Sequence, residues 1–175
     1  MLKKLLVSLL SALLCMSVVA ETESQLNGNQ NETDVKIDEN GDVFVAPLKY
    51  HISSDSTAEV IKDYYYKKLE SVVIPSEIRV DGHVYSVTYI GHYAFLGCSG
   101  LTSIKIPSSV TSIGKNAFLG CHALRSIEIP SSVTSIGFKA FMGCENLEIV
   151  IDNSKENVKV GENAFDGCKS VKFLK

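Results

Sequence analysis

Residues 101–114 read LTSIKIPSSVTSIG, and residues 124–137 read LRSIEIPSSVTSIG. Each stretch is followed by an Ala-Phe-x-Gly-Cys signature that also occurs once before and once after the pair, so that four copies lie at residues 94–98, 117–121, 140–144 and 164–168. The cysteines of the four signatures are 23, 23 and 24 residues apart. A repeat this short has too few apolar residues to close a core alone, so it has to stack on its neighbours. The spacing therefore predicts a solenoid.

The order of residues within one repeat predicts the path of one coil. Leu-x-x-Ile-x-Ile is typical of a short strand, Pro ends it, Val-x-x-Ile-Gly adds a second extended piece, and the signature turns the chain back. Burying one Ile or Phe side chain stabilises a fold by roughly 1.5–3 kcal/mol, whereas a surface charge pair contributes about 0–1 kcal/mol. We therefore expect the apolar positions of each coil to face inward, in the second coil Ile104, Ile106, Val110, Ile113, Phe118 and Cys121. The signature phenylalanines should form a single interior column, made of Phe95, Phe118, Phe141 and Phe165. The predicted fold class is a β-rich solenoid with short parallel strands.

The repeats occupy residues 69–175, as about four coils and a terminal partial coil. Compared with a regular coil, the first has nine extra residues between its proline and its glycine, and the pair Asp81-Gly82 among them predicts a β-hairpin inserted near residues 79–87. Residues 34–68 do not repeat but contain strand-like pieces, which predicts a β-rich N-terminal cap on the stack. The tyrosines at residues 64–66 have two roles open to them, an exposed aromatic surface and packing within the cap, and the sequence favours packing.

Residues 1–20 have the features of a cleaved secretory signal peptide. Lys3 and Lys4 precede an almost unbroken apolar run that ends at Ala20 and is short for a membrane span. A lipid anchor on Cys15 is an alternative, which is disfavoured because the bulky Leu14 precedes it. Residues 21–33 are rich in polar residues and predict a flexible linker. The expected localisation is secreted, cell-surface or periplasmic, with no integral membrane span in the exported chain.

Charge and composition exclude several classes of function. Lys and Arg number 17 against 20 Asp and Glu, and because residues 1–20 hold two lysines and no acids, the exported chain has a charge of 15 − 20 = −5. Without a basic excess, nucleic acid is not expected as a partner. The sequence contains no HExxH, GxSxG, phosphate-loop or GxGxxG motif. We therefore expect no catalytic residues and no cofactor, and a protein that is not an enzyme.

The four signature cysteines are also not expected to bind a metal. They lie one per coil, whereas a structural zinc site uses close pairs of cysteines. Their equivalent inward positions favour a ladder of buried free thiols, and disulfides between adjacent coils are the alternative.

The exposed face of the predicted concave sheet is the candidate partner-binding surface. Alternation along the strands sends these side chains outward on the regular coils: Ser103, Lys105, Ser126 and Glu128. On the next coil Ile149 and Ile151 fall at the same positions, and Phe173 follows one coil later. Two interpretations stay open. The three residues form an apolar patch for a partner, or a change of register turns the isoleucines inward and leaves Val150 outside.

The unit Ala-Phe-x-Gly-Cys-x-x-Leu-x-x-Ile-x-Ile-Pro-x-Ser-Val-x-x-Ile-Gly resembles the leucine-rich repeat of the BspA type, found in surface proteins of Bacteroides-like bacteria and some mucosal protozoa. The resemblance covers residues 69–175. It implies a leucine-rich-repeat stack and a secreted or surface-exposed recognition protein, since family members have been linked to adhesion to host matrix proteins and to other microbes. The expected function is a non-catalytic protein-binding or adhesion module that acts as a monomer. The alternative is a structural or assembly subunit that associates with itself through its uncapped C-terminal coil.

Overall fold

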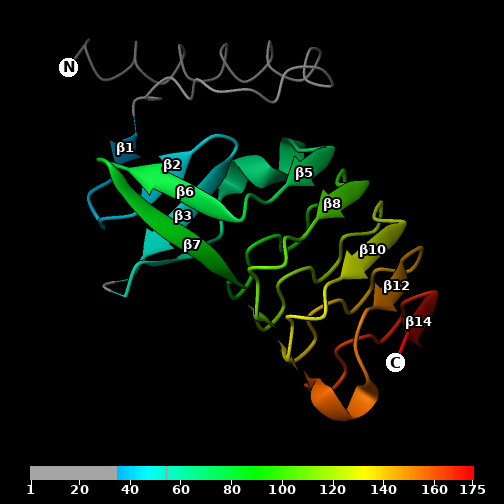
Figure 1. Cartoon of the computed structure of the whole chain (residues 1–175). Helices are drawn as coiled ribbons and strands as arrows, with labels where there is room; N and C mark the ends of the chain where they lie inside the picture. The colour runs from blue at the N-terminus through cyan, green and yellow to red at the C-terminus, as the bar shows by residue number, and fades with distance from the viewer. Residues whose placement is uncertain (1–34, 54) are drawn as a thin grey trace, which may run out of the picture. The chain divides into compact units, whose positions relative to one another are not determined.

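The strands of the chain gather into two sheets, as the computed structural model in Figure 1 shows. The structure describes residues 35–53 and 55–175, so the expected signal peptide and linker lie outside the described residues. The larger sheet consists of β1 (Lys36–Ile37), β2 (Val43–Val45), β3 (Leu48–Ile52), β4 (Thr57–Val60), β6 (Glu77–Val80), β7 (His83–Ile90), β9 (Ser112–Ile113), β11 (Ser135–Ile136) and β13 (Lys159–Val160). The smaller sheet consists of β5 (Ser71–Val73), β8 (Ser103–Lys105), β10 (Ser126–Ile129), β12 (Glu148–Ile151) and β14 (Ser170–Phe173). Two short 3-10 helices are η1 (Tyr64–Lys68) and η2 (Lys155–Asn157).

The smaller, five-stranded sheet takes one strand from each coil. Its strands pair in parallel in the order β14-β12-β10-β8-β5, and Figure 1 shows them side by side. The Leu-x-x-Ile-x-Ile segments form these strands because their alternating β-branched residues present one apolar face to the interior. The predicted parallel strands are confirmed.

The larger sheet joins an antiparallel part to a parallel part. Strands β1 to β4 pair antiparallel, β4 pairs in parallel with β7, and β7, β9, β11 and β13 continue in parallel with one strand from each coil. Strands β6 and β7 form an antiparallel hairpin whose turn residues Asp81 and Gly82 have φ angles of 48° and 78°. Both parts belong to one compact unit, Val35–Lys175.

The signature phenylalanines stack in a single column through the interior. Ring centroids lie 5.2 Å apart between Phe95 and Phe118, 5.0 Å between Phe118 and Phe141, and 6.0 Å between Phe141 and Phe165. Tyr66 of η1 extends the column at its N-terminal end, with its ring 5.1 Å from Phe95. The β-rich solenoid built on repeated hydrophobic rungs is confirmed.

The three tyrosines that precede β5 divide between the two predicted roles. Tyr66 is buried, and its hydroxyl oxygen accepts a hydrogen bond of 2.6 Å from the Lys49 backbone N–H. Tyr64 and Tyr65 are 74% and 58% exposed. Packing therefore holds for one tyrosine and surface exposure for the other two.

Polar ladders run beside the apolar rungs and tie each coil to the one before it. The Cys121 thiol donates to the Phe95 carbonyl at 3.1 Å, and the Cys144 thiol donates to the Phe118 carbonyl at the same distance. In the Pro-Ser-Ser turns, the hydroxyls of Ser109 and Ser132 donate 2.7 Å hydrogen bonds to carbonyls of the preceding coil. Where the last full coil lacks this turn, the Asn153 side-chain amide donates instead, to Ser131 at 3.0 Å.

No helix among the described residues is long and apolar enough to cross a membrane.

Candidate functional site

The exposed face of the five-stranded sheet carries two columns of side chains. We call the first the serine column, and strand pairing aligns its members Ser71, Ser103, Ser126, Glu148 and Ser170. The second, the variable column, lies two residues further along each strand and contains Val73, Lys105, Glu128, Val150 and Lys172. All ten side chains are exposed except that of Val150, which is half-buried. The four polar residues predicted for this surface, Ser103, Lys105, Ser126 and Glu128, therefore lie together on it.

The apolar patch predicted around Ile149 and Ile151 does not form. Ile149 pairs with Ile127 and Ile151 pairs with Ile129, so the strand is offset by 22 residues instead of 23, and the two side chains are only 1% and 0% exposed. A slip of one residue moves a whole set of side chains to the other face, and the register that buries two isoleucines wins because each contributes roughly 1.5–3 kcal/mol. The alternative register, with Val150 outward, is the correct one.

Phe173 follows the same register one coil later. It pairs with Ile151, and its partly buried side chain packs against the core, so it also does not extend the exposed face. The large apolar residue that this face does expose is at the other end of the sheet, where Val73 is 66% exposed. The exposed Tyr64 and Tyr65 belong to η1, which leads into the same strand. Each ring has a lysine ammonium over it, Lys67 at 5.5 Å from Tyr64 and Lys68 at 5.7 Å from Tyr65.

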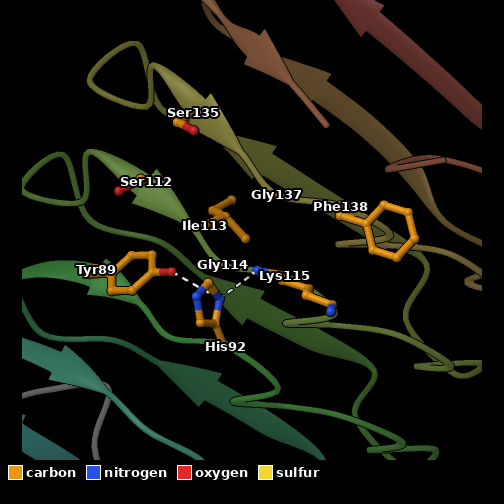
Figure 2. Close-up of a pocket in the computed structure, with 9 residues that line it drawn as sticks. All are labelled: Tyr89, His92, Ser112, Ile113, Gly114, Lys115, Ser135, Gly137 and Phe138. Carbon is orange, nitrogen blue, oxygen red and sulfur yellow. Dashed lines mark hydrogen bonds between the residues drawn. The ribbon is translucent and has the colours of Figure 1, made fainter. Parts of the chain in front are cut away.

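The larger sheet carries a pocket of about 350 Å³ that the sequence did not predict. Figure 2 shows its lining from three successive coils. One wall is a row of hydroxyl-bearing residues that strand pairing aligns, Tyr89, Ser112 and Ser135. The floor consists of Ile113, Gly114 and Gly137, and the opposite wall consists of His92, Lys115 and Phe138. We call this pocket the glycine-floored groove.

Close contact between coils explains the glycines of the floor. A Cβ atom on Gly114 would lie 2.7 Å from both the Gly91 carbonyl carbon and the His92 nitrogen, and one on Gly137 would lie 2.6 Å from the Lys115 nitrogen. Only glycine therefore fits here, and the absence of side chains from the floor leaves the groove open between its two walls.

Hydrogen bonds hold the first wall residues in place. The backbone N–H of Lys115 donates to His92 Nδ1 at 2.8 Å, and the Tyr89 hydroxyl lies 3.1 Å from the same nitrogen. Because a backbone N–H can only donate, Nδ1 is the acceptor and the ring proton of neutral His92 is on Nε2. The aromatic rings of Tyr89 and His92 meet edge to face with centroids 5.8 Å apart.

The charged groups around the groove are distributed unevenly. Lys115 and Lys139 place their ammonium groups 5.6 Å and 5.0 Å from the centroid of the Phe138 ring, and no carboxylate lines the groove. The nearest acidic neighbour along the sheet is Glu59, which pairs with Tyr89 across β4 and β7. Burial raises the pKa of the Glu59 carboxyl, and the charge of Glu59 adds to burial in raising the pKa of the Tyr89 hydroxyl.

The remaining candidates for chemistry are the cysteines. Cys98, Cys121 and Cys144 are buried and Cys168 is half-buried, and all four are free thiols, as the predicted ladder requires. Burial raises the pKa of the Cys98 thiol to about 11 and that of the Cys168 thiol to about 12. The thiolate is the nucleophilic form, so these cysteines are poor nucleophiles at neutral pH. No group of three or more His, Cys, Asp or Glu residues within 35–53 and 55–175 is arranged to hold a metal ion.

The comparisons with known proteins point to one family. A model of the BspA type leucine-rich repeat region matches residues 57–175 in six copies. No curated protein matched the chain.

Solved structures of similar proteins come from gut bacteria. A leucine-rich repeat protein from Bacteroides capillosus is 27% identical with a TM-score of 0.67, over 77% of this chain and 99% of that one. A leucine-rich repeat protein from Bacteroides ovatus is 35% identical with a TM-score of 0.64, over 73% of this chain and 33% of that one. A leucine-rich cell surface protein from Faecalibacterium prausnitzii is 27% identical with a TM-score of 0.57, over 74% of this chain and 32% of that one. The chain thus spans about one third of the length of the last two proteins.

The repeated rungs, the two parallel sheets and the family match agree with the resemblance seen in the sequence. The chain belongs to the BspA type leucine-rich repeat family.

Proposed function

We propose that this chain is an exported, non-catalytic recognition protein that binds a protein partner through the exposed face of its five-stranded sheet. The observation that carries the proposal is the contrast between the two sides of each strand. Inward positions repeat Ile or Val from coil to coil, whereas the variable column changes from Val to Lys, Glu, Val and Lys. The repeated positions build the stack, and the changing positions are free to fit a ligand.

The N-terminal end of this face supports a protein as the partner. Tyr64, Tyr65 and Val73 are the exposed large apolar side chains at this end. Tyrosine is enriched among the residues that dominate protein–protein binding energies, because it combines a large apolar ring with a polar hydroxyl. The signal-peptide features of residues 1–20 and the cell-surface relative from Faecalibacterium prausnitzii support an extracellular or cell-surface setting, with host matrix or other microbial surfaces as the expected partners.

The test is surface plasmon resonance of the purified protein over immobilised fibronectin, laminin and collagen, and over captured bacterial cells. We expect saturable binding to at least one of these surfaces. Tyr65→Ser or Glu128→Lys should weaken it about tenfold or more, as expected of a central interface residue. The matched control is Glu145→Lys, which makes the same charge change in an exposed turn outside both columns and should change affinity less than twofold.

Two results contradict the proposal: no saturable binding to any surface, or an equal loss of affinity in the control variant. Light scattering at increasing protein concentration checks the alternative of self-assembly. A protein that stays monomeric supports the recognition role, and growth into larger species supports assembly instead.

A further inference from the structure

We propose that the glycine-floored groove on the larger sheet binds an acidic saccharide chain. This site is separate from the protein-binding face proposed above, and the inference does not rest on that proposal. Its volume of about 350 Å³ is at the lower end of the range for pockets that take small ligands, which suits one or two sugar units at a time.

The charges of the groove select an anion. The groove is lined by the ammonium group of Lys115 and by the imidazole of His92, and Lys139 adds a second ammonium beside the Phe138 ring. No carboxylate lines it, although acidic residues outnumber basic ones in the chain by 20 to 17. A local excess of positive charge on an otherwise acidic protein attracts a negatively charged ligand.

The hydrogen-bonding groups of the groove favour a sugar. The hydroxyls of Tyr89, Ser112 and Ser135 recur once per coil, about 4.8 Å apart as neighbouring strands are, which is close to the length of one pyranose unit. Hydroxyls both donate and accept, so they complement the hydroxyls of a sugar ring. On the opposite wall the Nε2–H of His92 is left as a donor because Nδ1 already accepts.

The main chain of the floor disfavours a bound peptide strand. The N–H groups of Gly114 and Gly137 donate to Ile90 and Ile113 at 2.7 Å and 2.8 Å, and the carbonyls of Lys115 and Phe138 accept from the neighbouring coil at 3.0 Å and 2.9 Å. An added strand is held by free backbone donors and acceptors, and these are already paired. Recognition in the groove therefore depends on side chains, as is usual for saccharides.

The experiment compares three matched probes with the purified protein by calorimetry and by NMR titration into the millimolar range. The probes are tetragalacturonate, the neutral sugar maltotetraose and a tetraglutamate peptide. We expect saturable binding of tetragalacturonate, at least tenfold weaker binding of both other probes, and an affinity that falls as salt is added. Heparin tetrasaccharide as a fourth probe distinguishes sulfate from carboxylate recognition.

Two variants and one control assign the binding to the groove. Lys115→Gln and Phe138→Ser should each weaken tetragalacturonate binding at least fivefold. Lys105→Gln removes an equivalent exposed ammonium from the other sheet and should leave the affinity unchanged. Thermal unfolding of each variant confirms that the fold is retained, and Lys139→Gln provides a second charge variant if one of them is unstable.

Four results overturn the proposal: no binding of any acidic saccharide, equal binding of maltotetraose, tighter binding of tetraglutamate, or equal loss in the Lys105→Gln control. Because the protein-binding test uses the other sheet, failure of one proposal is distinguishable from failure of the other.

Discussion

Four residues at equivalent places in successive coils have a left-handed backbone conformation. Tyr93, Asn116, Lys139 and Asn163 have φ angles of 62°, 55°, 53° and 56°. This conformation costs roughly 1–2 kcal/mol for most residues, and least for asparagine, whose short side chain tolerates it. Two coils therefore have the favoured residue at this place, whereas the coils with Tyr93 and Lys139 have strained ones.

Replacing the strained tyrosine should stabilise the protein. Tyr93→Asn is expected to raise the free energy of unfolding by about 0.5–1 kcal/mol, because it relieves the backbone and removes a side chain that is already 36% exposed. Urea denaturation measures the change. Tyr64→Asn, at a position without positive φ, serves as the control and should not stabilise. A loss of stability in Tyr93→Asn would show that the tyrosine side chain outweighs the strain.

Glu59 should make stability depend on pH. Burial raises its pKa in the folded state, with the charges of His92 and His51 acting in the opposite direction and that of Asp42 in the same one. A raised pKa means that folding favours the protonated form, so this contribution is present at pH values below the unfolded pKa and is lost as the pH rises through the folded pKa.

Glu59→Gln should therefore be more stable than the natural protein at pH 7, and the difference should shrink toward zero below pH 4. Urea denaturation across this pH range measures it. A difference that stays constant with pH, or that grows toward low pH, would contradict the assignment.

The strand β12 shows how an element settles its register by burial. The repeat spacing places Ile149 and Ile151 on the exposed face, but the strand gives up one residue of offset and buries both. The outward position then goes to Val150, which is half-buried beside the serine and variable columns.

This register predicts opposite outcomes for two adjacent substitutions. Ile149→Ser should destabilise the protein by about 3 kcal/mol, because it leaves a cavity and buries a hydroxyl. Val150→Ser should cost less than about 1 kcal/mol at its outward position. Thermal or urea unfolding compares them, and equal losses in the two variants would contradict the register.

How far the sequence predicts the molecule depends on whether a feature repeats. The interior rungs were predictable because burial imposes the same residue type every 23 residues, as at Phe95 and Phe118. The place of Tyr66 at the end of the phenylalanine column was not, because it comes from a 3-10 helix outside the repeats. A one-residue change of spacing fits either face of a strand, so the position of Ile149 needed the packed structure.

The groove was hidden for a different reason. His92, Lys115 and Phe138 are each a single variable residue in its own coil and form no local motif. Aligning the coils on their Ile-Gly pairs and reading the residue that follows each glycine would have brought the three together. The hollow itself, however, follows from the close approach of the coils at Gly114 and Gly137.

At the scale of the whole molecule, each coil contacts only its neighbours, so stability passes along the stack through nearest-neighbour interfaces. The phenylalanine column is the most regular of these interfaces, with the rings of Phe118 and Phe141 5.0 Å apart and 4° from parallel. Phe95 and Phe165 are the two ends of the column and do not touch.

A pair of double-mutant cycles tests this stacked architecture most directly. Urea unfolding is measured for Phe118→Leu and Phe141→Leu, alone and together, and for Phe95→Leu with Phe165→Leu in the same way. Stacked neighbours should be coupled by about 0.5–1.5 kcal/mol, and the two ends should be additive within about 0.5 kcal/mol. Additive effects for Phe118 and Phe141, or equal coupling in both cycles, would contradict a single interior column of stacked coils.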